Sequence, residues 1–313
     1  MTLVSASGLI KRFGAVTAVN GISLGVAKGE VTGFLGPNGA GKSTTMKMVC
    51  GFLEPDAGRA EICGVDIWQH PVEAKRRLGY LPEGAPAYGD MAVADFLAFC
   101  GRMRGLSGGK LRNALAEMAE KVRLTEAWSK PIDTLSKGYR RRVGIAQALI
   151  HDPEVLVLDE PTDGLDPNQK HEMRNLIREI APGKAIVIST HILEEVEAIC
   201  SRAVIIAKGE VVADGSPHEL LARAAEGNAI RVTLATPETQ AVVERVRRQT
   251  DAEIEVLERV NGSTRLLLHY GQRPADAADL AQRLARAGLP VEEVGLWRPR
   301  LEDVFRNVTT TLH

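Results

Sequence analysis

The chain has 313 residues, a length that favours roughly two domains. Hydrophobic residues make up 44% and charged residues 25% of the chain, so it has enough apolar material for sizeable cores. The formal net charge of −1 excludes a protein that binds nucleic acid through its overall charge. We therefore expect no nucleic-acid partner, and any basic site must be local.

The four cysteines are scattered along the chain and form no CxxC pair. This spacing argues against a structural metal site and predicts reduced thiols in a cytosolic protein. The first residues, MTLVSASGLIKRFG, lack the apolar stretch of a signal peptide, and no apolar run reaches the length of a membrane span. We therefore expect a soluble chain that serves a membrane, if at all, by docking to a partner.

The first recognisable element is the apolar run EVTGFLG at 30–36, which is rich in β formers. It is followed by PNGAGKS and by TTMKMVCGFL, a helical pattern expected to end near Gly51. From about residue 90 to 151 the apolar residues recur at i, i+3, i+4 and i+7, which predicts a mostly helical subdomain. The two clearest faces are Val93, Phe96, Leu97 and Cys100, and Leu111, Leu115, Met118 and Val122.

Strand patterns return after the helical block, at 154–161, 185–190 and 203–215. The continuous apolar runs at 155–158 and 186–188 are typical of strands buried on both faces of a mostly parallel sheet. Lys208 and Gly209 predict a hairpin turn within the last stretch. Residues 1–221 are therefore expected to form an α/β domain.

A hinge is predicted in LARAAEGNA, residues 221–229. Beyond it the patterns follow the order β-α-β-β-α-β, which predicts a small C-terminal α+β domain of the ferredoxin-like type at 228–313.

The segment GPNGAGKS at 36–43 matches the phosphate-binding pattern GxxxxGK[ST] in full. Its glycines let the backbone approach phosphate oxygens, Lys42 reaches the terminal phosphates and the hydroxyl of Ser43 can ligate Mg²⁺. A plain glycine turn is the alternative, but the strand before the segment and the helix after it favour the nucleotide site. The expected nucleotide-binding residues here are Gly36, Pro37, Asn38, Gly39, Ala40, Gly41, Lys42, Ser43 and Thr44.

The strand VLVL at 155–158 leads directly into Asp159 and Glu160. Parallel α/β sheets bind ligands at the carboxyl ends of their strands, so Asp159 is expected to hold magnesium and Glu160 to orient or deprotonate an attacking water. Glu160 could instead be an ordinary acid at a helix start. His191 follows another strand and could bond a γ-phosphate oxygen, although a single histidine is often structural or solvated.

The segment LSKGYRRR at 135–142 places three arginines in the first turns of a predicted helix that Ser136 would cap. Cations are unfavourable at that end of a helix. An anion bound at the helix N-terminus would offset them, and a solvated basic turn is the alternative that these residues alone leave open.

Six motifs in this order and spacing resemble the ATP-binding subunit of an ABC transporter over residues 3–220. They are GPNGAGKS (36–43), LPE (81–83), LSKGY (135–139), VLVLDE (155–160), DGLD (163–166) and STH (189–191). The resemblance implies a P-loop NTPase core of the ABC ATPase type with ATP and Mg²⁺ as cofactors. It also implies that Lys42, Glu160 as general base and His191 as the switch histidine carry the hydrolysis.

The resemblance implies further roles at single positions. Phe13 stands where an aromatic ring stacks on adenine, although a core phenylalanine is the alternative. Glu83 stands where the family usually has a glutamine that contacts magnesium. Ser136 and Gly138 match residues that hold the γ-phosphate bound to the opposite subunit, and Asp166 matches the acid of the loop joining the two subunits. LSKGY would then be half of a composite site in a head-to-tail homodimer.

Lys137, Tyr139 and Glu83 depart from the commoner family pattern. Together with LEDVF at 301–305 they are similar to the cassettes of drug-resistance and gliding-motility exporters. The resemblance thus implies an ATPase at the cytoplasmic face of the inner membrane that powers export through separate membrane-spanning permease subunits.

The motifs leave two alternatives to an exporter, a soluble ABC ATPase and a GTPase or small-molecule kinase. A soluble ABC ATPase acting on ribosomes or DNA usually has two cassettes or a long coiled coil, whereas this chain has one cassette and no sustained heptad run. A GTPase or a small-molecule kinase would give LSKGY no role, and the sequence has no NKxD motif.

Overall fold

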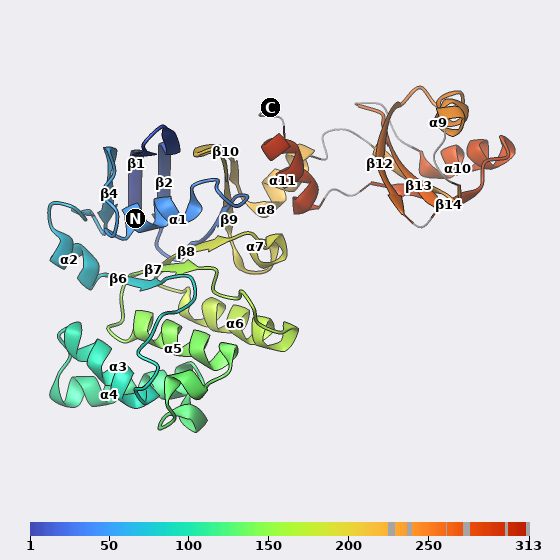
Figure 1. Ribbon diagram of the computed structural model, residues 1–313. Coiled ribbons are helices and arrows are strands. Elements are labelled where there is room, and N and C mark those ends of the chain that lie inside the picture. Colours follow the sequence, from blue (N-terminus) through green and yellow to red (C-terminus); the bar gives the residue numbers. More distant parts are fainter. Residues whose placement is uncertain (225–228, 237–239, 261, 272–275, 298–299, 311–313) are drawn as a thin grey trace. The chain divides into compact units, whose positions relative to one another are not determined.

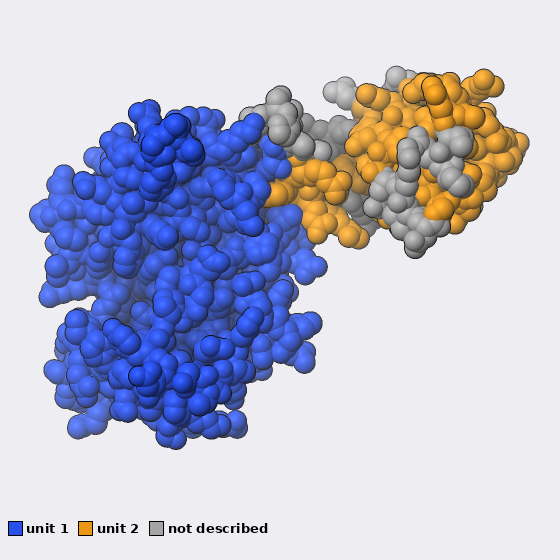
Figure 2. All heavy atoms as spheres, viewed as in Figure 1, with its two compact units in different colours: residues 1–217, 308–313 blue, residues 218–307 orange. Residues whose placement is uncertain are grey.

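The computed structural model describes residues 1–224, 229–236, 240–260, 262–271, 276–297 and 300–310 (Figure 1). The chain divides into two compact units, Met1–Pro217 with Val308–His313, and His218–Asn307, which Figure 2 shows in different colours. The division falls at Pro217 and His218, a few residues before the expected boundary at 221–228. Residues 225–228 of the predicted hinge lie outside the described residues.

The first unit is built around a six-stranded sheet with the strand order β10-β9-β3-β8-β7-β6. Five of these strands are parallel, and only β10 runs antiparallel to its neighbour. The predicted apolar runs lie in the middle of this sheet, where every residue of β7 and β8 is buried. The strands are β3 (Val31–Leu35), β6 (Leu78–Leu81), β7 (Val155–Asp159), β8 (Ala185–Thr190), β9 (Arg202–Ala207) and β10 (Glu210–Gly215).

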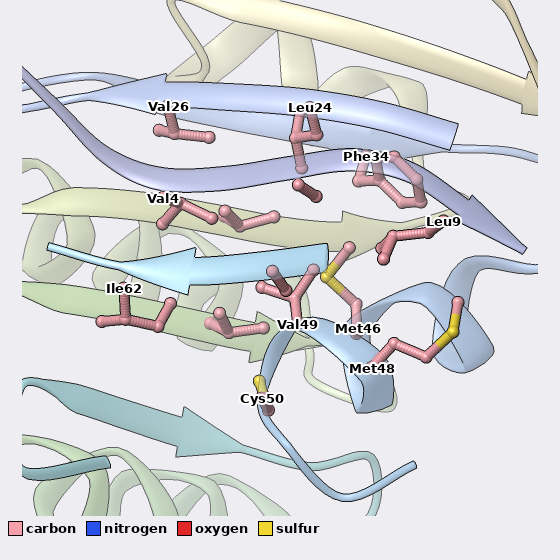
Figure 3. Close-up of a cluster of buried hydrophobic side chains, with 14 of the residues drawn as sticks. Val4, Leu9, Leu24, Val26, Phe34, Met46, Met48, Val49, Cys50 and Ile62 are labelled. Carbon is pink, nitrogen blue, oxygen red and sulfur yellow. The ribbon is translucent and has the colours of Figure 1, made fainter. Parts of the chain in front are cut away.

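A second, antiparallel sheet of the first unit has the order β2-β1-β4-β5. Its apolar side chains, such as Val4 and Ile62, share one core with Met46 and Val49 of α1 (Figure 3). Alternate residues of the six-stranded sheet, including Val155 and Val157, belong to the same core. Side chains at i and i+2 of a strand point to the same face, so the residues between them, such as Leu156, point to the opposite face. The antiparallel strands are β1 (Thr2–Phe13), β2 (Val16–Ala27), β4 (Ala57–Ile62) and β5 (Val65–Asp66).

The first unit has three α-helices between residues 93 and 149, within the range 90–151 where we expect a helical subdomain. Six of the eight residues named for its two faces are buried, among them Phe96 and Met118. The helices are α1 (Lys42–Val49), α2 (Pro71–Arg76), α3 (Val93–Met103), α4 (Gly108–Lys121), α5 (Lys137–Leu149), α6 (Pro167–Ile180) and α7 (Leu193–Ile199). The 3₁₀ turns Thr125–Ala127 and Ile132–Thr134 connect α4 to α5.

The predicted hairpin turn joins β9 to β10. Lys208 and Gly209 both have positive φ angles, 49° and 82°, as a two-residue turn between twisted strands requires.

The second unit shows the predicted β-α-β-β-α-β order, preceded by α8 (Pro217–Ala224), which begins at the division between the units. Its antiparallel sheet has the order β12-β13-β11-β14, and a separate apolar core lies between this sheet and helices α9 and α10. The elements are β11 (Ala229–Leu234), α9 (Gln240–Arg247), β12 (Glu253–Val260), β13 (Ser263–His269), α10 (Ala277–Arg286) and β14 (Val291–Leu296). The LEDVF segment begins α11 (Leu301–Thr310).

Candidate nucleotide-binding and hydrolysis site

The loop between β3 and α1 contains two positions that only glycine can occupy. Gly41 has a φ of 102°, and a Cβ atom there would lie 2.4 Å from the carbonyl oxygen of Ala18. A Cβ atom at Gly36 would lie 2.6 Å from the carbonyl oxygen of Ile206. Neither backbone oxygen can move aside cheaply, so the packing of β2 and β9 against the loop fixes its curvature.

Lys42 is the first residue of α1, and its side chain folds back over the loop. Its Nζ atom donates hydrogen bonds to the carbonyl oxygens of Gly36, at 2.6 Å, and Pro37, at 3.2 Å. Burial lowers the pKa of Lys42, while the carboxylates of Glu160, Asp159 and Glu83 act in the opposite direction. An ammonium group has a third N–H, which can reach a phosphate oxygen.

A cavity of about 310 Å³ lies over this loop. Phe13, at the end of β1, lines the cavity with its ring half-exposed, so Phe13 is not the core phenylalanine of the alternative interpretation. The cavity therefore brings together the residue expected to contact adenine and those expected to contact phosphates. Its lining residues are Phe13, Ala18, Asn38, Gly39, Gly41, Lys42, Ser43 and Thr44.

Asp159 ends β7, beside Ser189 of β8, and is almost fully buried. Its Oδ1 atom has no hydrogen-bond partner among the described residues, and burial raises the pKa of the carboxyl group. A buried carboxylate oxygen without a partner is costly, and a cation beside it removes that cost.

The expected magnesium ligands fit that ion. Ser43 offers a hydroxyl, and Asp159 and Glu83 offer carboxylates, Glu83 from the exposed turn after β6. Mg²⁺ usually binds one or two carboxylates together with nucleotide phosphates and water, rather than an all-protein cage. In the described part of the chain, no group of three or more histidine, cysteine or acidic side chains could hold a metal ion.

Glu160 and His191 lie together at the ends of β7 and β8. The Nδ1 atom of His191 is 2.9 Å from Oε1 of Glu160, and the hydroxyl of Thr190 donates to Oε2 at 3.3 Å. The backbone of Glu160 has a φ of 48°, an unfavourable conformation for this residue, and its N–H donates to the carbonyl oxygen of Ser189 at 2.8 Å. Such local strain is typical of functional sites.

The signature segment lies at the N-terminus of α5. Ser136 caps this helix, because its side chain accepts a hydrogen bond from the N–H of Tyr139 at 3.4 Å. Gly138 is buried, and a Cβ atom there would lie 2.8 Å from the side-chain amide of Gln169. Gly138 and Tyr139 line another cavity, of about 620 Å³, none of whose lining residues also lines the cavity over the phosphate loop.

The arginines after the signature segment do not form the solvated basic turn that was the alternative. Arg141 is 6% exposed, and its Nη2 atom donates to the carbonyl oxygen of Asp163 at 3.5 Å. Arg142 pairs with Glu172 of α6 and donates to the carbonyl oxygen of Val122. Two of the three side chains are therefore absorbed into the packing of α5, and only Arg140 is exposed.

Asp166 has a local role that the sequence did not reveal. Its carboxylate accepts a hydrogen bond from the N–H of Gln169 at 2.9 Å and so caps α6. Because the side chain of Gln169 also contacts Gly138, this cap lies next to the signature segment.

Sequence reasoning missed a buried carboxylate, Glu195 of α7, which bonds to Thr162 and Thr190. A signal was present, since Glu195 lies between Ile192, Val196 and Ile199, on the apolar face of the helix.

These features define the class of protein. A glycine loop between a parallel strand and a helix, with a lysine in the loop and an acid at the end of a neighbouring strand, is the arrangement of a P-loop nucleoside triphosphatase.

Comparison with known proteins narrows the class. The family model described as "ABC transporter" matches residues 19–163. The chain is 36% identical to the "Nod factor export ATP-binding protein I" of Ralstonia nicotianae over 98% of this chain and 94% of that protein. It is 35% identical to the "Daunorubicin resistance ATP-binding protein DrrA2" of Streptomyces coeruleorubidus, with the same coverage of both chains. A solved "ATP binding subunit of ABC transporter" matches with a TM-score of 0.66 and 30% identity, over 71% of this chain and 92% of that chain.

The chain therefore belongs to the family of ABC transporter ATP-binding proteins. It binds ATP and hydrolyses it, and both the fold class and the family predicted from the sequence are confirmed. In the described part of the chain, no helix combines the length and the apolar character that crossing a bilayer requires.

Proposed function

We propose that the chain powers export of a substrate through separate membrane-spanning permease subunits, from the cytoplasmic face of the inner membrane. Its similarity, over nearly its whole length, to proteins named for export and for drug resistance supports the direction of transport. One observation supports the proposed chemistry most directly. The Nδ1 atom of His191 lies 2.9 Å from Oε1 of Glu160, at the carboxyl ends of the neighbouring strands β8 and β7.

In this proposal Lys42 and the backbone amides of residues 39–43 hold the β- and γ-phosphates. Glu160 orients the attacking water and accepts its proton, and His191 holds the Glu160 carboxylate and bonds the γ-phosphate. Ser43, Asp159 and Glu83 would hold Mg²⁺, which neutralises charge on the phosphate oxygens when bound. Lys42 and the loop amides are in place before the reaction. They therefore stabilise the negative charge that develops on the phosphate oxygens without having to reorganise.

The second half of each site comes from a second copy of the chain. Ser136 and Gly138 bind the γ-phosphate held by the partner, and Asp166 lies at the junction of the two subunits in a head-to-tail homodimer. The separate linings of the two cavities support this arrangement, because the residues that bind ATP do not line the cavity beside the signature segment. The helical subdomain docks to the permease, and the domain at 228–313 supports the dimer.

The Glu160→Gln variant tests the chemistry. It removes the base and keeps the shape of the side chain, so we expect ATP binding to be retained and hydrolysis to fall about a hundredfold. Steady-state hydrolysis and nucleotide binding are the measurements, with Lys42→Ala as the control that should lose binding. Normal turnover in Glu160→Gln would refute the assignment of Glu160.

The same variant tests the partner. Glu160→Gln with ATP should accumulate as a closed dimer and co-purify from membrane extracts with a multi-span protein that has no cassette of its own. Lys42→Ala, which should not close, serves as the matched control. Recovery of ribosomes or DNA without a membrane protein would leave the ATPase chemistry intact and overturn the transport proposal.

A further inference from the structure

Glu195 is a buried carboxylate that the proposed chemistry does not use. It lies in the short helix α7 and is 1% exposed. Its Oε1 atom accepts a hydrogen bond from the hydroxyl of Thr162, in the turn that follows Glu160. Its Oε2 atom is 3.4 Å from the hydroxyl of Thr190, the residue before His191. One side chain thus joins the two turns that carry Glu160 and His191.

The hydroxyl of Thr190 lies between two carboxylates. It is 3.3 Å from Oε2 of Glu160 and 3.4 Å from Oε2 of Glu195. It also accepts the N–H of Ile192 at 3.1 Å, which fixes its oxygen atom. A hydroxyl has a single proton to donate, so Thr190 can satisfy only one of the two carboxylates at a time. The direction of the Glu160 carboxylate therefore depends on what else Glu195 binds.

Glu195 has other favourable partners. Thr162 donates to it. Burial raises the pKa of Glu195, and the positive charges of Arg174 and Lys170 on α6 oppose that rise. These partners hold Glu195 without the proton of Thr190, which leaves that proton for Glu160. Because Glu195 contacts both Thr162 and Thr190, its buried carboxylate restrains the turn after Glu160 and the end of β8.

We infer that Glu195 is a positioning residue for ATP hydrolysis: because it accepts the hydrogen bond of Thr162, the hydroxyl of Thr190 can donate to the Glu160 carboxylate and hold it in place. The inference rests on the proposed role of Glu160. It predicts that the network acts on the chemical step, and that nucleotide binding through the Lys42 loop does not depend on it.

The test uses four single variants of the full-length protein. Thr190→Val removes the hydroxyl and keeps the branched shape, whereas Thr190→Ser keeps the hydroxyl and removes the methyl group. Glu195→Gln keeps the shape and replaces one acceptor oxygen by a donor. Glu194→Gln is the matched control, because Glu194 is the exposed neighbour on the same helix.

We expect kcat for ATP hydrolysis to fall about tenfold in Thr190→Val and Glu195→Gln, because each loses a hydrogen bond to a charged group at the site. KM and the affinity for ATP should stay within about twofold, and Thr190→Ser and Glu194→Gln should keep the wild-type kcat. A purely structural role would instead lower the melting temperature without changing kcat of the folded fraction. That result, or an unchanged kcat in Thr190→Val, would overturn the inference.

A double variant separates this inference from the proposal on which it rests. If Thr190 acts through Glu160, single-turnover hydrolysis by Glu160→Gln should not slow further when Thr190→Val is added. If Thr190→Val slowed hydrolysis by Glu160→Gln by a further tenfold, Thr190 would act on hydrolysis independently of Glu160. Normal hydrolysis by Glu160→Gln alone would refute the base assignment itself, whatever the Thr190 variants do.

Discussion

At the scale of single residues, a glycine can be required for its backbone conformation, for close packing, or for both. Gly41 combines a positive φ with a backbone oxygen only 2.4 Å from where a Cβ atom would lie. Gly64, in the turn between β4 and β5, has a φ of 76° but open space around it. The two positions therefore separate the cost of backbone conformation from the cost of close packing.

We expect Gly41→Ala to lower the free energy of unfolding by at least about 2 kcal/mol and to abolish ATP binding, because the loop must move away from Ala18. Gly64→Ala should cost only about 1 kcal/mol and leave ATP binding unchanged. Urea unfolding and equilibrium binding of a fluorescent ATP analogue measure both effects. Wild-type binding by Gly41→Ala would show that the loop can relax around a methyl group.

The residues of the phosphate site could be predicted from the sequence, because their spacing along the chain is itself the chemical requirement. The surroundings of Glu160 could not. The bond from Thr162 to Glu195 joins residues 33 positions apart, and only the parallel pairing of β7 with β8 brings their loops together. The burial of Arg141 was equally hidden, since three consecutive arginines are typical of a surface.

At the scale of elements, continuous apolar runs predicted the buried strands of the large sheet well. In β7 and β8 both faces are covered, so no alternation in the sequence was needed to place them. The antiparallel strands β1 and β2 were harder to find. They are 12 residues each and irregularly paired, with register shifts that break the two-residue period. Their extent was therefore missed.

The turn after α5 contains a histidine, His151, that makes the first unit sensitive to acid. The Nε2 atom of His151 lies 3.1 Å from the carbonyl oxygen of Leu78, at the start of β6. Burial, followed by the charge of Arg104, lowers the pKa of His151 to about 4. An unfolded histidine titrates near its ordinary value of about 6.5, so the unfolded chain binds more protons than the folded chain between these two pH values.

The free energy of unfolding should therefore fall as the pH is lowered through this range. From pH 7 to pH 5 we expect wild type to lose about 1 to 2 kcal/mol more than the His151→Gln variant, after allowing for partial exposure of the ring. Urea unfolding at the two pH values gives the difference. Equal losses in the two proteins would show that His151 titrates normally in the folded chain.

At the scale of the whole molecule, the two compact units have separate apolar cores. One core contains residues between Leu3 and Ile206, and the other contains residues between Ile230 and Val294. All the residues that line the cavity over the phosphate loop belong to the first unit.

We therefore expect two transitions in calorimetric unfolding, with ATP acting on one of them. The Glu160→Gln variant should not consume ATP. With ATP at about 100 times its Kd, we expect the first unit to be stabilised by at least about 2.7 kcal/mol and its transition to move further than that of the second unit. Lys42→Ala should show no shift. A single transition that moves as a whole would show that the units unfold together.

The separation of the phosphate loop from the signature segment has a genetic consequence. In the proposed dimer, one subunit's Lys42 serves the same ATP as the other subunit's Ser136. A Lys42 variant and a Ser136 variant would each be inactive alone. A mixed pair would combine both defects in one site and leave the second site with two intact halves. Two defective alleles expressed together would then complement one another, whereas two alleles damaged in the same half-site would not.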